Sequence, residues 1–168
     1  MSDFPSLQPA FTVRVVIDAP LSVGDAKGSP LAIVPMTSGT VKSEPGFEPK
    51  LDAELHGVGY DYIHNDASGE AMRLDVRSQV KNNDGTILAM YYKGTVALTD
   101  GVKAILSGSP DAKTTGFGDS FTTFTFETGN PAYKALANGT FVAAGHFVKE
   151  PNSKEVIVEY KVSLARAG

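Results

Sequence analysis

Alternation of apolar and polar residues with a period of two is the feature that most restricts how this chain can fold. It is clearest over residues 72–81, where Met72, Leu74, Val76, Ser78 and Val80 alternate with Arg73, Asp75, Arg77, Gln79 and Lys81. Successive side chains of a β-strand point to opposite faces of its sheet, so this pattern predicts a strand with one face in the core. Similar patterns predict strands over residues 11–18, 31–36, 51–56, 58–64, 87–98, 120–127, 140–148 and 155–164.

The dipeptide Asp84-Gly85 follows the clearest strand and predicts a tight hairpin. Asp-Gly is typical of a two-residue type I′ turn, because both of its positions need a positive φ angle. In such a turn Asn83 pairs with Thr86, and counting back along the two strands puts Arg77 opposite Tyr92. Residues that face each other across a strand pair lie on the same side of the sheet. The sequence therefore predicts that Arg77 and Tyr92 share one face.

The remaining segments between the strands carry turn and helix signals. A second Asp-Gly, at residues 100–101, is expected to turn the chain into another strand over residues 102–107. Residues 107–119 are rich in Gly, Ser and Pro and show no period, which predicts a loop. One short helix is predicted over residues 131–137, because Asn130 is a good N-cap and proline is tolerated at the first helical position.

The fold class follows from the number and spacing of these elements. Roughly nine strands at hairpin spacing are too many for a flat open sheet, since twist accumulates and exposed edges favour aggregation. We therefore predict an all-β chain that forms a single antiparallel β-barrel of lipocalin or streptavidin size, with one short helix. A two-sheet sandwich is the alternative. The sequence has no internal repeat and no linker, so residues 1–168 are expected to form a single domain.

Composition excludes several classes of function. The chain has no cysteine, which excludes a disulfide framework, a thiolate metal site and a cysteine nucleophile. A formal charge of −4 argues against nucleic acid as a partner, because a phosphate-binding surface needs an excess of basic residues. No apolar run approaches the length of about 20 residues that crosses a bilayer. The N-terminus has no basic and apolar signal segment, so we expect a cytoplasmic protein with no membrane partner.

The residues that could perform chemistry do not form a standard motif. His56, His64 and His146 make no closely spaced ligand pair, and no nucleotide-binding sequence is present, so neither a metal nor another cofactor is expected. Carboxylates and arginines gather in one part of the sequence: Asp61, Asp66, Glu70, Arg73, Asp75 and Arg77. On patterning alone they belong to a solvated outer face. In a barrel, a row with Asp75, Arg77 and Tyr92 instead lines the cavity.

Several short motifs between Leu51 and Leu164 together resemble one known family. They are Gly59-Tyr60-Asp61-Tyr62, Leu74-Asp75-Val76-Arg77, Asp84-Gly85 with Gly94, Phe126-Glu127-Thr128-Gly129, and the segment Tyr133–Asn138. This set is similar to the fungal branch of the DUF3237 (UPF0311) family. Tyr62 stands where that family has a tryptophan. The family often has one arginine beside the position of Phe124, where this chain has threonines, and another after the helix asparagine, where this chain has Gly139. Fewer arginines suit a larger and less anionic ligand.

The resemblance implies an antiparallel β-barrel and a class of activity. Some fungal members resemble accessory enzymes of aromatic polyketide biosynthesis, including one that adds a phenol oxygen across a prenyl alkene without a redox cofactor. We therefore expect a cofactor-independent cyclase or isomerase that closes a ring in a hydrophobic aromatic small molecule by acid–base catalysis, a hydroalkoxylation-type reaction. A homo-oligomer is also expected. A non-catalytic barrel that carries a hydrophobic molecule is the alternative, and a purely structural protein without a cavity is a third.

Roles for individual residues follow from this hypothesis. Asp61 is the predicted acid–base residue, because burial raises the pKa of a carboxyl, and Arg77 is predicted to orient the reacting oxygen. The predicted ligand-binding residues are Tyr60, Tyr62, His64, Asp75, Tyr92, Phe124, Phe126 and Glu127. Each has a purely structural alternative. Asp61 and Arg77 can form an ion pair between strands, His64 can be a surface residue, the phenylalanines can be core, and Glu127 can stabilise the following turn.

Overall fold

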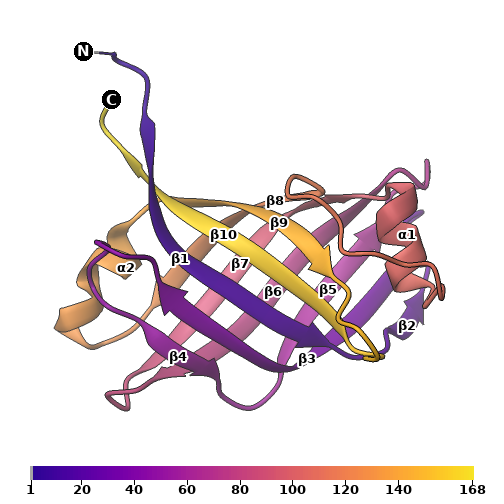
Figure 1. Cartoon of the computed structure of the whole chain (residues 1–168), viewed down its shortest axis with the longest axis horizontal. Coiled ribbons are helices and arrows are strands. Elements are labelled where there is room, and N and C mark those ends of the chain that lie inside the picture. The colour runs from indigo at the N-terminus through magenta and orange to yellow at the C-terminus, as the bar shows by residue number, and fades with distance from the viewer. Residues whose placement is uncertain (1) are drawn as a thin grey trace.

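Ten strands make up most of the computed structural model, which describes residues 2–168 (Figure 1). They are β1 (Ser6–Ile17), β2 (Leu21–Gly24), β3 (Leu31–Ser43), β4 (Asp52–Leu55), β5 (Gly59–Asn65), β6 (Ala71–Asn82), β7 (Ile87–Ala97), β8 (Ser120–Glu127), β9 (Phe141–Val148) and β10 (Val156–Arg166). Every pairing between them is antiparallel.

The order of the strands closes the sheet on itself. It runs β1-β10-β9-β8-β7-β6, then through β4 and β5 to β3, and β3 pairs back onto β1. Because β4 and β5 both lie between β3 and β6, they occupy one position in an eight-stranded barrel. The prediction of a closed antiparallel barrel is confirmed. Closure leaves no long unpaired edge, which is how barrels avoid edge-to-edge association.

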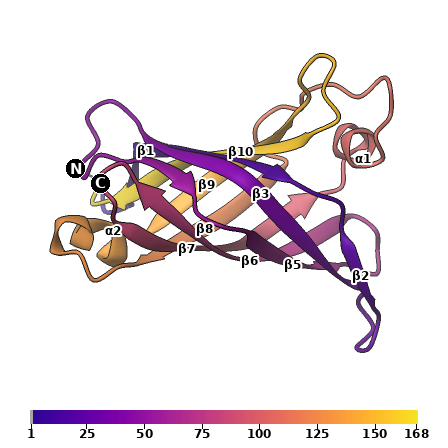
Figure 2. The same ribbon diagram turned by 90° about the horizontal axis from the view of Figure 1, so that it is seen from below.

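Two short helical segments lie at opposite ends of the barrel (Figures 1 and 2). At one end, a 3₁₀ turn, η1 (Pro131–Tyr133), leads into α2 (Lys134–Asn138). This is the helix that the sequence predicts, and Asn130 caps it as expected, since its Oδ1 accepts a hydrogen bond from the Ala132 amide at 3.0 Å. The other end carries α1 (Asp100–Leu106). No helix within residues 2–168 combines the length and the apolar character that crossing a bilayer requires.

The helix α1 corrects the prediction of a turn and a strand over residues 100–107. Thr99 acts as its N-cap, because its Oγ1 accepts from the Val102 amide at 3.3 Å. Asp100 lies in the first turn, where the helix dipole favours a negative charge. Val102 and Ile105 are three residues apart and are both buried, so the apolar period of this segment is helical.

The hairpin between β6 and β7 differs from the prediction by one residue. The amide of Gly85 donates to the Asn82 carbonyl at 2.9 Å, and Gly85 has a φ of +89°. This is a type I turn followed by a left-handed glycine, which makes a loop of three residues where two were predicted. Arg77 therefore pairs with Tyr91. A slip of one residue exchanges the two faces of a strand, so Tyr92 points into the barrel while Arg77 points out of it.

Aromatic side chains fill the barrel at the α2 end. Phe11 lies at the centre of this phenylalanine cluster, with ring centroids 5.3–6.3 Å from those of Phe47, Phe124, Phe126 and Phe141. All of these rings are at most 3% exposed. Close packing of large rings in mostly edge-to-face contacts stabilises this half of the molecule. The other half has a different interior.

Candidate functional site

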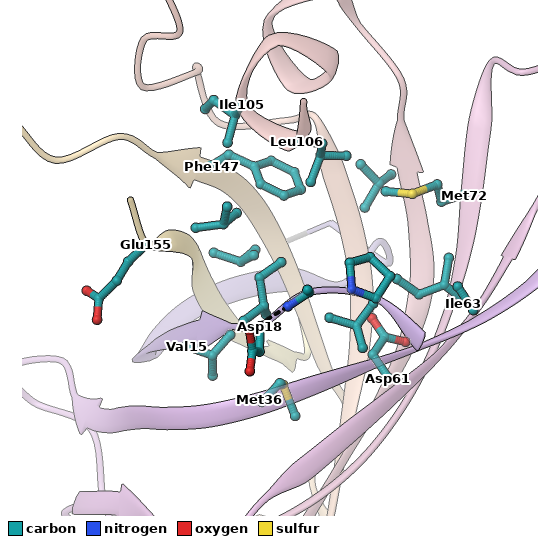
Figure 3. A pocket seen from close by; sticks show the side chains of 18 of the residues that line it. Val15, Asp18, Met36, Asp61, Ile63, Met72, Ile105, Leu106, Phe147 and Glu155 are labelled. Atoms are coloured by element: carbon teal, nitrogen blue, oxygen red, sulfur yellow. Dashed lines mark hydrogen bonds between the residues drawn. The ribbon is translucent and has the colours of Figure 1, made fainter. Parts of the chain in front are cut away.

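A cavity of about 680 Å³ occupies the α1 end of the barrel (Figure 3). Its floor lies where the phenylalanine cluster begins, since the ring of Tyr92, which lines it, stacks on Phe124 at a centroid distance of 4.3 Å. Ile105 and Leu106 of α1 lie over one side, opposite Asp61 and Met36. Cavities of this size bind small molecules in many proteins.

Most of the cavity wall is aliphatic. The side chains that make it so come from several strands and include Val15, Ile17, Val34, Met36, Ile63, Met72, Leu74, Val96 and Val158. Charged residues lie at the mouth, among them Asp18, Lys154 and Glu155. Within residues 2–168, no group of three or more His, Cys, Asp or Glu side chains is placed to hold a metal ion.

Asp61 is the buried carboxyl of this cavity. It lies in β5, which alternates strictly, so that Gly59, Asp61 and Ile63 face inward. Only 8% of Asp61 is exposed. Burial raises the pKa of this carboxyl from 3.8 to about 7, although a hydrogen bond from the Asp75 amide at 3.0 Å opposes the change. Near neutral pH the carboxylic acid and the carboxylate are therefore both populated, as a group that exchanges protons requires.

Two tyrosines share the interior with Asp61. Tyr92 of β7 and Tyr160 of β10 both line the cavity, and their ring centroids are 5.2 Å apart. The Tyr92 hydroxyl donates to the thioether sulfur of Met36 at 3.3 Å, which is a weak acceptor. Burial, and to a lesser extent the charge of Asp61, raise the pKa of both phenols. Both tyrosines therefore remain neutral hydrogen-bond donors near neutral pH.

Tyr160 is a cavity residue that the sequence reasoning missed. It belongs to the alternating row Val158, Tyr160 and Val162 of β10, and all three side chains are buried. A single tyrosine in an otherwise aliphatic inward row was the available signal, because a buried phenol usually serves a hydrogen bond.

Several predicted site residues lie on the outer face of the barrel, and their predicted place in the cavity is wrong. Tyr60, Tyr62 and His64 alternate with inward-facing residues of β5, so the inward position of Asp61 turns all three outward. The two tyrosines are 40% and 42% exposed. Among the described residues Asp61 forms no ion pair with Arg77, so the structural alternative for this pair is wrong as well.

The outward row of β6 makes contacts of its own. The Arg77 guanidinium lies 4.8 Å from the centroid of the Tyr91 ring, a cation–π contact, and the Tyr91 hydroxyl donates to Glu127 at 2.7 Å. Asp75 and Lys93 form an exposed ion pair at 3.6 Å. The predicted cavity row of Asp75, Arg77 and Tyr92 is therefore divided, because only Tyr92 faces inward. Glu127 also lies outside the cavity.

Phe124 and Phe126 belong to the phenylalanine cluster. Phe124 supports the floor of the cavity from below through its stacking on Tyr92. Phe126 lies deeper, 5.5 Å from Phe11 between ring centroids. Neither side chain lines the cavity, so the structure gives both of them the core position that was their alternative.

The loop between α1 and β8 covers the cavity and is fastened to the barrel. Its first part, Ser107–Ser109, lines the mouth. Its second part lies on β9, where the Thr115 amide donates to the Phe147 carbonyl at 2.9 Å. Nδ1 of His146 lies 2.8 Å from the Thr115 carbonyl oxygen, and the Phe117 ring stacks on this imidazole. Together α1 and this loop form a cap over one side of the cavity.

Solved structures show the same fold at low sequence identity. A conserved protein of unknown function from Rhodopseudomonas palustris is 18% identical, with a TM-score of 0.77 over 98% of this chain and 100% of that one. A beta-barrel like protein from Acinetobacter baumannii is 21% identical, with a TM-score of 0.71 over 99% of each chain. An enzyme from Penicillium herquei is 15% identical, with a TM-score of 0.60 over 96% and 95%.

Sequence comparison identifies the family. A search of curated proteins found no match to the chain. The family model described as "Protein of unknown function (DUF3237)" matches residues 5–165, which is nearly the whole chain and more than the segment that carries the short motifs. The likeness to the solved structures extends over the same length. The chain therefore belongs to the DUF3237 family.

Proposed function

We propose that this protein is an acid–base catalyst that closes or isomerises a hydrophobic aromatic small molecule inside the barrel. The observation that carries the proposal is the position of Asp61, a buried carboxyl whose pKa is raised to about 7, on the wall of an apolar cavity of about 680 Å³. A catalytic acid is most effective when its pKa lies near the working pH. An aliphatic wall suits an apolar substrate and limits the access of water.

The proposed reaction is an intramolecular addition of a phenol to an alkene. The Asp61 carboxylic acid donates its proton to one alkene carbon, and the phenol oxygen forms a new C–O bond at the neighbouring carbon. The phenol proton then returns to the Asp61 carboxylate, so the product is an isomer of the substrate and the acid is regenerated. Tyr92, whose hydroxyl donates to the weak Met36 thioether acceptor, would hold a carbonyl of the substrate.

Two further observations support this chemistry. The cavity can hold a folded substrate with its reacting ends together, and such positioning contributes as much as proton transfer or more. The enzyme from Penicillium herquei has the same fold, so the barrel itself is compatible with catalysis. The phenolic polyketide substrate is inferred from the family resemblance together with the apolar wall.

A non-catalytic carrier is the second candidate, and the same cavity favours it. The wall is mostly aliphatic, and only a few polar side chains, including Asp61, Tyr92 and Tyr160, face the interior. A carrier needs no more than this to bind an apolar ligand. It would return its ligand unchanged, whatever the protonation state of Asp61.

The test is to incubate the purified chain with prenylated and unprenylated phenolic polyketides and to follow mass and chiral chromatography. Catalysis predicts an isomer of unchanged mass and a single handedness from a prenylated substrate. The Asp61→Asn variant should lose about 10²–10⁴-fold in turnover, the range typical of an acid–base group. Asp52→Asn makes the same chemical change at an exposed position of β4 and is the matched control.

The outcomes separate the two candidates. Turnover within about threefold of wild type in Asp61→Asn would remove this residue as the proton donor. Binding without conversion in the wild-type protein would favour the carrier. Loss of turnover in the Asp52→Asn control would show that the assay reports damage to the fold.

A further inference from the structure

We propose that the Tyr160 hydroxyl donates a hydrogen bond to an oxygen atom of the ligand, so that the cavity selects neutral phenols bound with the oxygen end innermost. This inference rests on the proposed function, because it names the ligand class of the same cavity. It also assigns a role to a residue that neither the family motifs nor the sequence pattern singled out.

The first argument is the unused hydrogen-bonding capacity of Tyr160. Its side chain is 3% exposed and lines the cavity, yet none of the hydrogen bonds within residues 2–168 involves its hydroxyl. The Ser120 side chain lowers the Tyr160 pKa, but Ser120 Oγ has no hydrogen-bond partner within residues 2–168. The enclosed polar atoms without a partner in this part of the chain are Asp119 Oδ2, Ser120 Oγ and Thr122 Oγ1, so the Tyr160 hydroxyl opens on the cavity and keeps its capacity to donate. A ligand oxygen would supply the missing partner.

The second argument is the contrast with Tyr92. The hydroxyl of Tyr92 already donates to the Met36 sulfur, and its ring is stacked on Phe124. A ligand that takes a hydrogen bond from Tyr92 must replace this contact, whereas a ligand that takes one from Tyr160 replaces no hydrogen bond formed within residues 2–168. Tyr160 is therefore the donor that a ligand can use at the lower cost.

The third argument is the acceptor beside this donor. Asp61 and Tyr160 line the same cavity, and the charge of Asp61 raises the Tyr160 pKa. Oδ1 of Asp61 accepts from the Asp75 amide, and Oδ2 takes part in no hydrogen bond among the described residues. A phenol O–H accepts one hydrogen bond and donates another. It therefore matches a Tyr160 donor and an Asp61 acceptor at once.

Charge excludes the other common oxygen ligands. A ligand carboxylate at this depth would bring a second negative charge next to Asp61 in apolar surroundings, where like charges are costly. The lysines that could neutralise it, Lys149 and Lys154, follow the end of β9 and line the mouth. An anionic ligand would thus be held with its charge at the mouth, and only a neutral oxygen suits the floor.

The test compares the binding of two probes of equal shape, para-octylphenol and para-octyltoluene, to the full chain by isothermal titration calorimetry. The wild-type chain should bind the phenol about tenfold more tightly than the toluene, which is the difference that one or two net hydrogen bonds make. Tyr160→Phe should weaken phenol binding by about fivefold to tenfold and leave toluene binding unchanged. Tyr91→Phe removes an outer hydroxyl from the neighbouring chain position of Tyr92 and is the matched control, expected to behave as wild type.

A second measurement keeps the unaltered chain as the test object. The wild-type protein is labelled with ¹³C at the tyrosine ζ carbon, and the Tyr160 resonance is identified as the one that the Tyr160→Phe spectrum lacks. Adding the phenol should shift this resonance, and adding the toluene should not. If that variant does not fold, the phenol should still shift a resonance of one of the three buried tyrosines, Tyr92, Tyr133 and Tyr160, and the Tyr133→Phe and Tyr92→Phe spectra show which resonances belong to the other two.

Three results would overturn the inference: a wild-type chain that does not prefer the phenol, a Tyr160→Phe variant that keeps the full preference, or a wild-type chain that binds neither probe. None of them depends on turnover. Product formation without phenol selectivity would leave the cyclase proposal standing alone. Phenol selectivity without product would indicate a non-catalytic carrier whose ligand selectivity comes from the Tyr160 hydroxyl.

Discussion

Replacing Asp61 with asparagine should change how the stability of the barrel depends on pH. The pKa of this carboxyl is 3.8 in an ordinary setting and about 7 in the folded chain. Between these values the folded protein keeps the proton while the unfolded chain releases it. The free energy of unfolding therefore falls as pH rises, by about 1.4 kcal/mol per pH unit. The contribution is fully present below pH 3.8 and is lost once pH passes about 7.

The size of the effect follows from the difference between the two pKa values. From 3.8 to about 7 is a difference of about three pH units, which corresponds to roughly 4 kcal/mol as an upper value. Asparagine has no proton to release, so the Asp61→Asn variant should lack this slope. Relative to the wild type, the variant should gain stability continuously from pH 4 to 7 and keep its gain at pH 8.

Urea denaturation of both proteins at pH 5, 6, 7 and 8 measures this difference directly. Subtracting the two curves cancels the other titrating groups, because they are common to both chains. The reasoning would be refuted if the two curves ran parallel across this range, since Asp61 would then have the same pKa in the folded and unfolded states. The Asp52→Asn variant makes the same substitution at an exposed position of β4 and is the matched control for the chemical change itself.

Three further substitutions test other parts of the structure. Arg77→Met should leave turnover within about twofold of wild type, because surface changes away from a site have small effects and this arginine lies on the outer face; a loss beyond tenfold in the cyclisation assay would contradict that placement. Tyr133→Phe should lower the free energy of unfolding by about 1–2 kcal/mol in urea, since its hydroxyl donates to Asp84 at 2.5 Å and fastens η1 to the β6–β7 hairpin; an unchanged midpoint would show that this bond adds nothing. Gly94→Ala should cost about 2–4 kcal/mol or abolish soluble expression, because a Cβ there would lie 2.0 Å from the Phe121 carbonyl oxygen; thermal unfolding near the wild-type temperature would rule out this close approach of β7 and β8.

The barrel itself could be predicted because its main signal is repeated in almost every strand. Over residues 72–81 each apolar residue is buried and each charged one is exposed or half-buried, as the period of two requires. Closure then follows from the number of strands and the cost of free edges. Asp61 obeys the same alternation, between the inward Gly59 and Ile63 of β5, but the sequence analysis chose it as a buried carboxyl and placed its outward neighbours Tyr60 and Tyr62 in the same site.

The prediction of which residues of β6 and β7 face the cavity depended on the type of one turn. The sequence Asn82-Asn83-Asp84-Gly85 fits a two-residue type I′ turn and also a three-residue loop that ends in a left-handed glycine, and both need glycine at the same place. The difference is one residue of register, but it decides which face of β6 meets Tyr92. Local turn chemistry does not distinguish the two. The packing of Met72, Leu74 and Val76 inside the barrel does.

The helix α1 and Tyr160 were missed for different reasons. At Asp100-Gly101 the dipeptide is a good turn signal, and the helix became visible only through Thr99 as a cap and the burial of Val102 and Ile105. Tyr160 lies in a strand that was predicted correctly. Its importance depends on sharing a cavity with Asp61, a residue 99 positions earlier in the chain, and sequence spacing does not show that two such residues line one cavity.

The barrel has a filled end and a hollow end. Tight packing, which stabilises the fold, and open space, which a ligand needs, therefore lie in different parts of one interior. The phenylalanine cluster fills the α2 end with large rings, while side chains such as Val15, Ile63 and Val96 border open space as well as the core. The open space can accept a larger side chain at these positions, whereas a smaller one loses core contacts. In protein engineering, the side chains of the cavity at the α1 end can be varied while the phenylalanine cluster is kept unchanged. Libraries confined to the cavity wall should yield folded proteins with new ligand preferences more often than libraries that reach the phenylalanines.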